Sequence, residues 1–227
     1  MPRLAKVGAL AGIVWGLTCA VSLADPVIVG GNTLTSEWEF GHGAIRVGSD
    51  GAWEIGAGSP ANSWTNADTA NVSGGFTSGS VYGFTLSFDS ESGELSLMAG
   101  GETVIYATGM NSSPTAILID FEGSQSYDQS VFLTNLAVDG TALDPSGLSV
   151  TSFDPNGSHV FWTLTNLTNF GTLTGSFQFD YTFGAGFKPS IQFALGGAPS
   201  SVPDPASLLL VGVGLVGVGL LADCRKN

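Results

Sequence analysis

A period-two alternation of apolar and polar residues is the feature that most constrains how this chain can fold. Four segments carry it: Val81–Phe88, Val160–Leu164, Ser176–Phe183 and Ile191–Leu195. Successive side chains of a β-strand point to opposite faces, so each segment would place one face on a core and the other in solvent. This arrangement is typical of antiparallel sheets.

Turn residues separate these segments and agree with a β fold. The clearest turn is Asp139-Gly140, which lies between two apolar runs, as in a two-residue hairpin. Further turns are expected at Asp89–Gly93, Gly100-Gly101, Asp154–Gly157 and Lys188-Pro189. No amphipathic helix stands out. We expect an all-β domain over residues 25–200, an antiparallel β-sandwich or jelly-roll-like fold of roughly ten to twelve strands, with a loop-rich stretch from Gly43 to Gly75.

Length and charge limit the functions that this chain can have. The chain has 227 residues and a formal net charge of -13. Between residues 25 and 200 its only basic residues are Arg46 and Lys188, and this part contains no cysteine. Nucleic-acid binding needs Lys and Arg to neutralise phosphates, so the composition argues against it. A domain without disulfides must be stabilised by its core, and this length suffices for one.

The first 24 residues have the organisation of a secretory signal peptide. Two basic residues precede the apolar stretch Val7–Val21, and Ser22 and Ala24 place small side chains before a cleavage site. Signal peptidase would then release a mature chain that begins at Asp25. Two alternatives remain open, a retained N-terminal membrane helix and a lipoprotein modified at Cys19.

The last 27 residues, 201–227, contain a second apolar segment. Ala206–Ala222 carries no charge, is long enough to cross a bilayer, and is followed by Arg225 and Lys226. The positive-inside bias places this basic end in the cytoplasm and the main domain on the opposite side of the membrane. The alternative is a buried helix of a soluble domain.

Two prolines stiffen the chain just before this segment. Each Pro of Val202-Pro203-Asp204-Pro205 fixes its own φ and favours an extended predecessor, a conformation that peptidases bind. Together with Ala206–Ala222 and the Arg225-Lys226 tail, this motif resembles the PEP-CTERM sorting domain, with Asp204 in place of the usual Glu. The resemblance implies a Gram-negative surface or secreted protein that an exosortase cleaves near the motif, in a family that accompanies exopolysaccharide and biofilm production.

Catalytic motifs are lacking in the rest of the chain. The sequence has no GxSxG, HExxH or paired CxxC pattern. Glycines flank His42, which suggests an exposed loop, and His159 directly precedes a strand, so both are expected at the surface or an edge. We therefore predict no catalytic residues and no enzyme. A surface hydrolase would need His159 beside a serine and a carboxylate.

Acidic turns supply the candidate metal ligands of this sequence. Asp89, Glu91 and Glu94 cluster in one turn, and Asp139 and Asp144 lie close in sequence in another. Hard oxygen ligands in turns suit calcium, although neither turn matches an EF-hand loop. We expect no cofactor, with calcium at these turns as the alternative to charged, solvated turns.

Three tryptophans suggest an alternative role in sugar binding. Trp38, Trp53 and Trp64 fall in the less regular N-terminal third, where exposed rings could stack on sugars, although tryptophans more often fill a core. The favoured hypothesis is a non-enzymatic protein, exported through the inner membrane, anchored there transiently, and delivered to the outer surface or the extracellular matrix. Its expected partners are signal peptidase, exosortase and exopolysaccharide.

Overall fold

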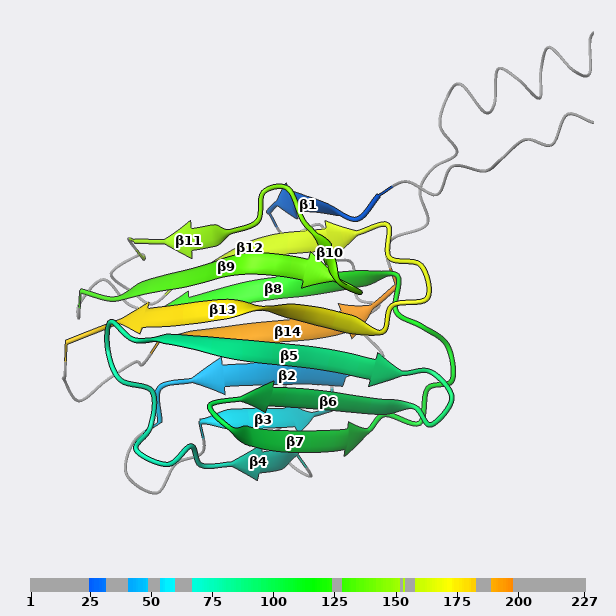
Figure 1. The fold of residues 1–227 in the computed structure, drawn as a ribbon, viewed down its shortest axis with the longest axis horizontal. Helices are drawn as coiled ribbons and strands as arrows, with labels where there is room; N and C mark the ends of the chain where they lie inside the picture. The colour runs from blue at the N-terminus through cyan, green and yellow to red at the C-terminus, as the bar shows by residue number, and fades with distance from the viewer. Residues whose placement is uncertain are drawn as a thin grey trace, which may run out of the picture.

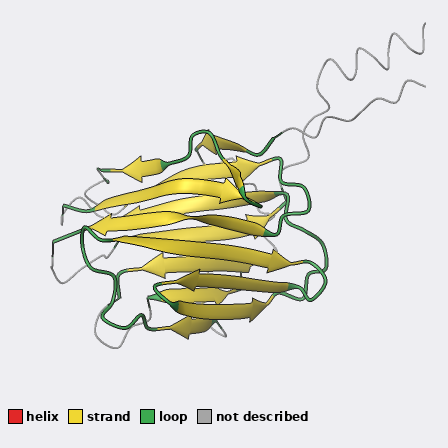
Figure 2. Cartoon of the chain, in the orientation of Figure 1, coloured by secondary structure: helices red, strands yellow, loops and turns green. Residues whose placement is uncertain are grey.

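The computed structural model describes residues 25–31, 41–48, 54–59, 67–123, 128–151, 153, 158–182 and 189–197. These residues form 14 β-strands and no helix (Figures 1 and 2). Every strand pair is antiparallel, and the strands make two sheets of seven. The all-β antiparallel class predicted from the alternation is therefore confirmed.

Sheet A has the strand order β1-β12-β8-β14-β2-β3-β4. Its strands come from both halves of the chain, since the late strands β12 and β14 flank β8. In sheet order the bounds are Val27–Gly30, Ser158–Thr165, Ala116–Gly123, Ser190–Gly196, Gly41–Arg46, Ile55–Gly58 and Asp68–Ala70.

Sheet B has the order β10-β9-β13-β5-β6-β7, and β11 also pairs with β9. The bounds in that order are Thr141–Ala142, Ser130–Val138, Thr172–Asp180, Val81–Asp89, Glu94–Ala99 and Glu102–Ala107, with β11 at Leu148–Val150. Figure 1 looks through both sheets and shows their strands running in similar directions, as in aligned sheet packing.

One hydrophobic core fills the space between the sheets. Sheet A contributes Ile119, Phe121 and Phe193, and sheet B contributes Leu86 and Phe177, among others. The rings of Phe84 and Phe193 stack across the two sheets with centroids 5.1 Å apart. Neither sheet could bury its apolar face alone, so each depends on the other.

Three of the four alternating segments behave as the sequence predicts, whereas in Val160–Leu164 the polar residue Thr163 is buried rather than exposed. Phe84, Leu86 and Phe88 of β5 are buried, and their neighbours Thr85 and Ser87 are more exposed. The same holds for Phe177 and Phe179 in β13, and for Ile191, Phe193 and Leu195 in β14. Asp139-Gly140 forms the predicted hairpin turn between β9 and β10, with φ of 49° and 80°.

The stretch from Gly43 to Gly75 is more regular than expected. Its described residues include most of β2 and all of β3 and β4, at one side of sheet A. Glycine at position 43 serves close sheet packing, because a Cβ there would lie 3.1 Å from Leu86 Cδ1 of sheet B. The described strands also outnumber the expected ten to twelve.

Several predicted features lie outside the described residues. These are residues 1–24 with Ser22 and Ala24, the sorting segment with Val202–Pro205, Ala206–Ala222 and Arg225-Lys226, and Trp38, Trp53 and Trp64. In the part of the chain that is described, no helix combines the length and the apolarity needed to cross a membrane. Asp25 is the first described residue, two positions before β1.

Candidate functional site: a polar cluster on sheet A

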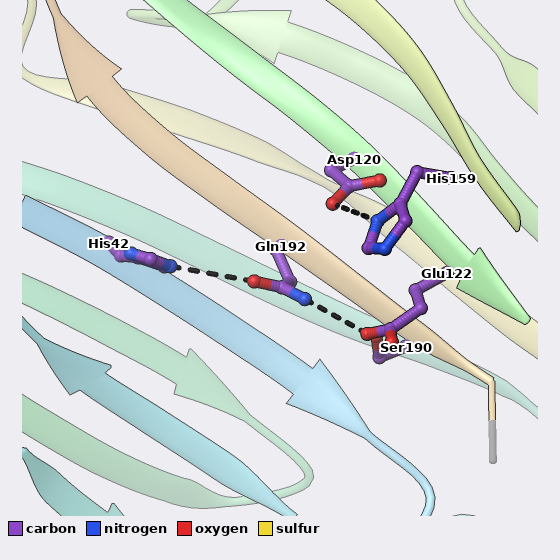
Figure 3. A network of polar contacts seen from close by, with 6 residues as sticks. All are labelled: His42, Asp120, Glu122, His159, Ser190 and Gln192. Atoms are coloured by element: carbon purple, nitrogen blue, oxygen red, sulfur yellow. Dashed lines mark hydrogen bonds and ion pairs between the residues drawn. The ribbon is translucent and has the colours of Figure 1, made fainter. Parts of the chain in front are cut away.

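Six polar side chains gather on the outer face of sheet A, as Figure 3 shows. They come from four strands: His42 of β2, Asp120 and Glu122 of β8, His159 of β12, and Ser190 and Gln192 of β14. We call this set the polar cluster.

Strand alternation puts these residues on one face. In β8 the core residues Ile119 and Phe121 point inward, so Asp120 and Glu122 point outward. In β14 the inward side chains of Ile191 and Phe193 leave Ser190 and Gln192 on the outer face. The register then sets Ser190 opposite Glu122 and Gln192 opposite Asp120.

Hydrogen bonds divide the polar cluster into two parts (Figure 3). In one part, the Gln192 amide Nε2 donates to Glu122 Oε2 at 3.1 Å, and Ser190 Oγ donates to the same oxygen at 3.2 Å. His42 Nε2 donates to Gln192 Oε1 at 3.5 Å. In the other part, His159 Nδ1 donates to Asp120 Oδ2 at 2.8 Å.

Burial changes across the polar cluster. His42, Asp120 and Ser190 are buried, with exposed fractions of 4%, 8% and 6%. The His159 side chain is 47% exposed, and Glu122 and Gln192 are intermediate. Solvent therefore reaches the cluster from the His159 and Glu122 side, while the His42 end is closed.

Burial shifts two titratable groups in opposite senses. Burial raises the pKa of Asp120 to about 6, the hydrogen bond and charge of His159 oppose this rise, and the Glu122 charge adds to it. Burial lowers the pKa of His42 to about 4. At neutral pH the cluster thus holds an ionised Asp120 and a neutral His42.

Asp120 keeps one unused acceptor. Among the residues that the structure describes, none hydrogen bonds to its buried Oδ1 atom. A buried carboxylate oxygen without a donor is costly, and such positions call for a functional explanation.

A cation lies close to the acidic side of the cluster. Arg46 of β2 is opposite Ser190 in the register. Burial lowers the pKa of the Arg46 guanidinium, and the charges of Glu54 and Glu122 counteract this effect. Arg46 thus interacts electrostatically with two carboxylates, Glu54 and Glu122.

The structure corrects the placement of one histidine. His42 was expected in an exposed loop, but it is buried within β2, in the interior of sheet A. Its flanking glycines allow close approach of the sheets, since a Cβ at Gly41 would lie 3.1 Å from Leu95 Cδ2. His159 lies in β12 near its start and is half exposed, close to the expected edge position.

The arrangement required for a serine hydrolase is only partly present. His159 contacts the carboxylate of Asp120, but the Ser190 hydroxyl donates to Glu122. Within the described ranges, no serine hydroxyl hydrogen bonds to His159. The cluster therefore has a histidine–carboxylate pair without the nucleophile that a triad requires.

The acidic turns singled out in the sequence use their carboxylates locally. Asp89 Oδ1 accepts the Glu91 N–H at 2.8 Å, and Ser92 Oγ donates to both Asp89 and Glu94. Asp139 Oδ1 accepts the N–H groups of Gly171 and Thr172. The described residues contain no group of three or more His, Cys, Asp or Glu placed to hold a metal ion. Asp144 is exposed, directly before a cis proline.

Sequence reasoning missed the polar cluster, although a signal was present. Asp120 and Glu122 alternate with Ile119 and Phe121, which is the pattern of a half-polar strand with two carboxylates on one face.

No model of a known protein family matches the chain, and no curated protein matches it significantly.

Proposed function

We propose that this chain is a non-enzymatic protein, exported and then sorted to the cell surface or extracellular matrix by an exosortase. The observation that carries the proposal is the order of three features at the C-terminal end. Val202-Pro203-Asp204-Pro205 precedes the uncharged segment Ala206–Ala222, and Arg225-Lys226 follows it. This order matches the PEP-CTERM sorting signal and suits an anchor with its basic end in the cytoplasm.

The first step of the proposed export route uses a signal peptide at residues 1–24. Cleavage after Ala24 would leave Asp25 as the first residue, ahead of the edge strand β1. The Asp25 carbonyl accepts a hydrogen bond from the Asn166 amide at 3.4 Å. The described β-sheets begin after this cleavage position, so removal of residues 1–24 would take away none of their strands.

The second step of the route uses a helix over Ala206–Ala222, which anchors the chain in the inner membrane until cleavage. The last described strand, β14, ends at Gly196, before the Val202–Pro205 motif. Cleavage near Pro203–Pro205 would therefore release a jelly-roll-like β-sandwich with all its described strands. The role we assign to this domain is at the surface, in association with exopolysaccharide.

The direct test is expression of a tagged chain with and without an exosortase. We expect a loss of mass only when the enzyme is present, because the segment after the motif is removed. Asp204→Ala should reduce processing, and the matched control Asp128→Ala, at an exposed loop position, should be processed as the wild type. An unchanged mass under both conditions would overturn the proposal.

A second candidate function is carbohydrate binding by the exported domain. The polar cluster of sheet A favours it, because amide, hydroxyl and carboxylate groups gather on one solvent-reached face. Such groups commonly orient polar ligands in binding sites. This candidate concerns what the domain does after delivery, and it is independent of the sorting route.

A further inference from the structure

We propose that the polar cluster binds a neutral sugar, whose hydroxyl groups contact Asp120, Glu122 and Gln192. The proposal rests on the carbohydrate-binding candidate and places it at a defined site. It moves the expected sugar contacts from Trp38, Trp53 and Trp64 to the outer face of sheet A. Four observations support it: an unused acceptor, a mixed set of polar groups, a ring platform and the local charge.

The unused acceptor is the Oδ1 atom of Asp120. Its partner oxygen Oδ2 accepts a hydrogen bond from His159, while no described residue donates to Oδ1. Asp120 as a residue is 8% exposed, so solvation of this atom is restricted. Because Oδ1 itself is buried, a ligand hydroxyl would reach it only after a local side-chain rearrangement, and would then supply the missing donor.

The polar groups around Asp120 match a ligand with several hydroxyls. Glu122 offers carboxylate acceptors, and Gln192 offers an amide with both donor and acceptor capacity. Gln192 is opposite Asp120 in the register, and neighbouring strands lie about 4.8 Å apart. Adjacent hydroxyls of a single sugar ring can span groups at such a separation.

A ring platform borders the carboxylates. His159 and Phe161 of β12 stack with an interplanar angle of 7° and centroids 5.7 Å apart. Phe161 is opposite Asp120 in the register, and His159 is opposite Glu122. The His159 side chain is 47% exposed beside the polar groups, so its ring offers apolar surface to a pyranose.

Charge selects against acidic ligands. The chain carries a formal net charge of -13, and the cluster itself holds two carboxylates. The nearby Arg46 interacts electrostatically with Glu54 and Glu122. A uronic acid, sulfate or phosphate group would be repelled at this face, so the ligand class is a neutral sugar.

The test is binding of the full-length protein, purified in mild detergent, to an array of neutral gluco-, galacto- and manno-oligosaccharides beside uronic-acid oligosaccharides. We expect retention of a neutral oligosaccharide only. Asp120→Asn and Glu122→Gln should each weaken binding by about tenfold or more, because each alters a charged hydrogen-bonding partner. The matched control Glu102→Gln, at the exposed start of β7 in sheet B, should bind as the wild type.

His159→Gln provides a second variant at a half-exposed position where misfolding is of less concern. It removes the ring platform and should weaken binding of the neutral oligosaccharide. Thermal unfolding curves check that each variant is folded. A blank array, retention of uronic-acid glycans alone, or equal binding by the wild type and folded cluster variants would overturn the proposal. None of these results would affect exosortase-dependent processing, so the two proposals fail separately.

Discussion

At the residue scale, burial of Asp120 and His42 makes opposite contributions to stability as pH changes. The folded pKa of Asp120 is raised to about 6, so the native state holds a proton that the unfolded state releases, and stability falls as pH rises towards 6. The folded pKa of His42 is lowered to about 4, so the unfolded state binds the extra proton, and stability rises from pH 4 to about 6.5.

The first prediction separates these two contributions. In Asp120→Asn only the His42 contribution remains, so the free energy of unfolding should increase between pH 4 and 6.5. The wild type loses the Asp120 contribution over this range, so the change in the variant should exceed the change in the wild type by on the order of 3 kcal/mol. Urea unfolding at several pH values measures this. Among the described residues, His159 and Glu122 act electrostatically on Asp120, and Glu122 and Glu54 act on the neighbouring Arg46.

The complementary variant supplies the control. In His42→Gln the Asp120 contribution remains, and the free energy of unfolding should decrease over the same pH range. Parallel pH profiles for the wild type and both variants would contradict this account of the polar cluster.

A second residue-scale prediction concerns the turn between β9 and β10. Asp139 has φ of 49°, and its carboxylate accepts N–H bonds from Gly171 and Thr172 at 3.1 and 2.7 Å. Asp139→Ala should lower the free energy of unfolding by about 1–3 kcal/mol, because it removes two hydrogen bonds to a carboxylate and strains the turn. Asp139→Asn keeps an acceptor and tolerates this φ, so its loss should be smaller. Equal losses in a denaturant titration would speak against this role of the carboxylate.

At the element scale, sequence alternation predicted the strands with one polar face. β5, β13 and β14 were recognised because their apolar residues recur at every second position. β8 was missed, since Ala116, Ile117, Leu118 and Ile119 are all buried and form a continuous apolar run. A segment buried on both faces loses the period-two signal, and in β8 this left only the short alternation around Asp120 and Glu122.

Glycine also obscured strands in the N-terminal third. β2 and β3 contain several glycines, which usually mark turns, but Gly43 faces Leu86 and Leu97 of the opposite sheet. The contacts that require a small residue here are between segments distant in sequence, so local patterns could not reveal them. The contacts of the polar cluster are equally long-range: His42 and Gln192 are 150 residues apart.

The element-scale prediction addresses the irregular pairing of β13 with β9. The register shifts between Thr174 and Ser176, and a Cβ at Gly175 would lie 2.7 Å from Phe84 Cε1 and 3.1 Å from the Thr134 carbonyl. Gly175→Ala should therefore lower the free energy of unfolding by about 1–3 kcal/mol. Gly30→Ala is the control, as no atom lies within 4 Å of its added Cβ. If Gly175→Ala left the melting temperature unchanged, the close packing at this position would be refuted.

At the scale of the whole molecule, the two sheets share one core and should unfold together. Phe193 of sheet A stacks on Phe84 of sheet B, and core residues of both sheets form one cluster. We expect far-UV and near-UV circular dichroism to report the same denaturation midpoint. Two separated transitions would show that the sheets are not one cooperative unit.

The delivery route is also a property of the whole molecule, because it depends on both ends of the chain and on the domain between them. The described strands run from Val27 to Gly196, which lies within the proposed mature chain. The most direct test is the intact mass of the protein recovered outside exosortase-containing cells. We predict a chain that begins at Asp25 and ends near Pro203–Pro205. A recovered chain that still carries Ala206–Ala222 and Arg225-Lys226 would contradict the sorting proposal.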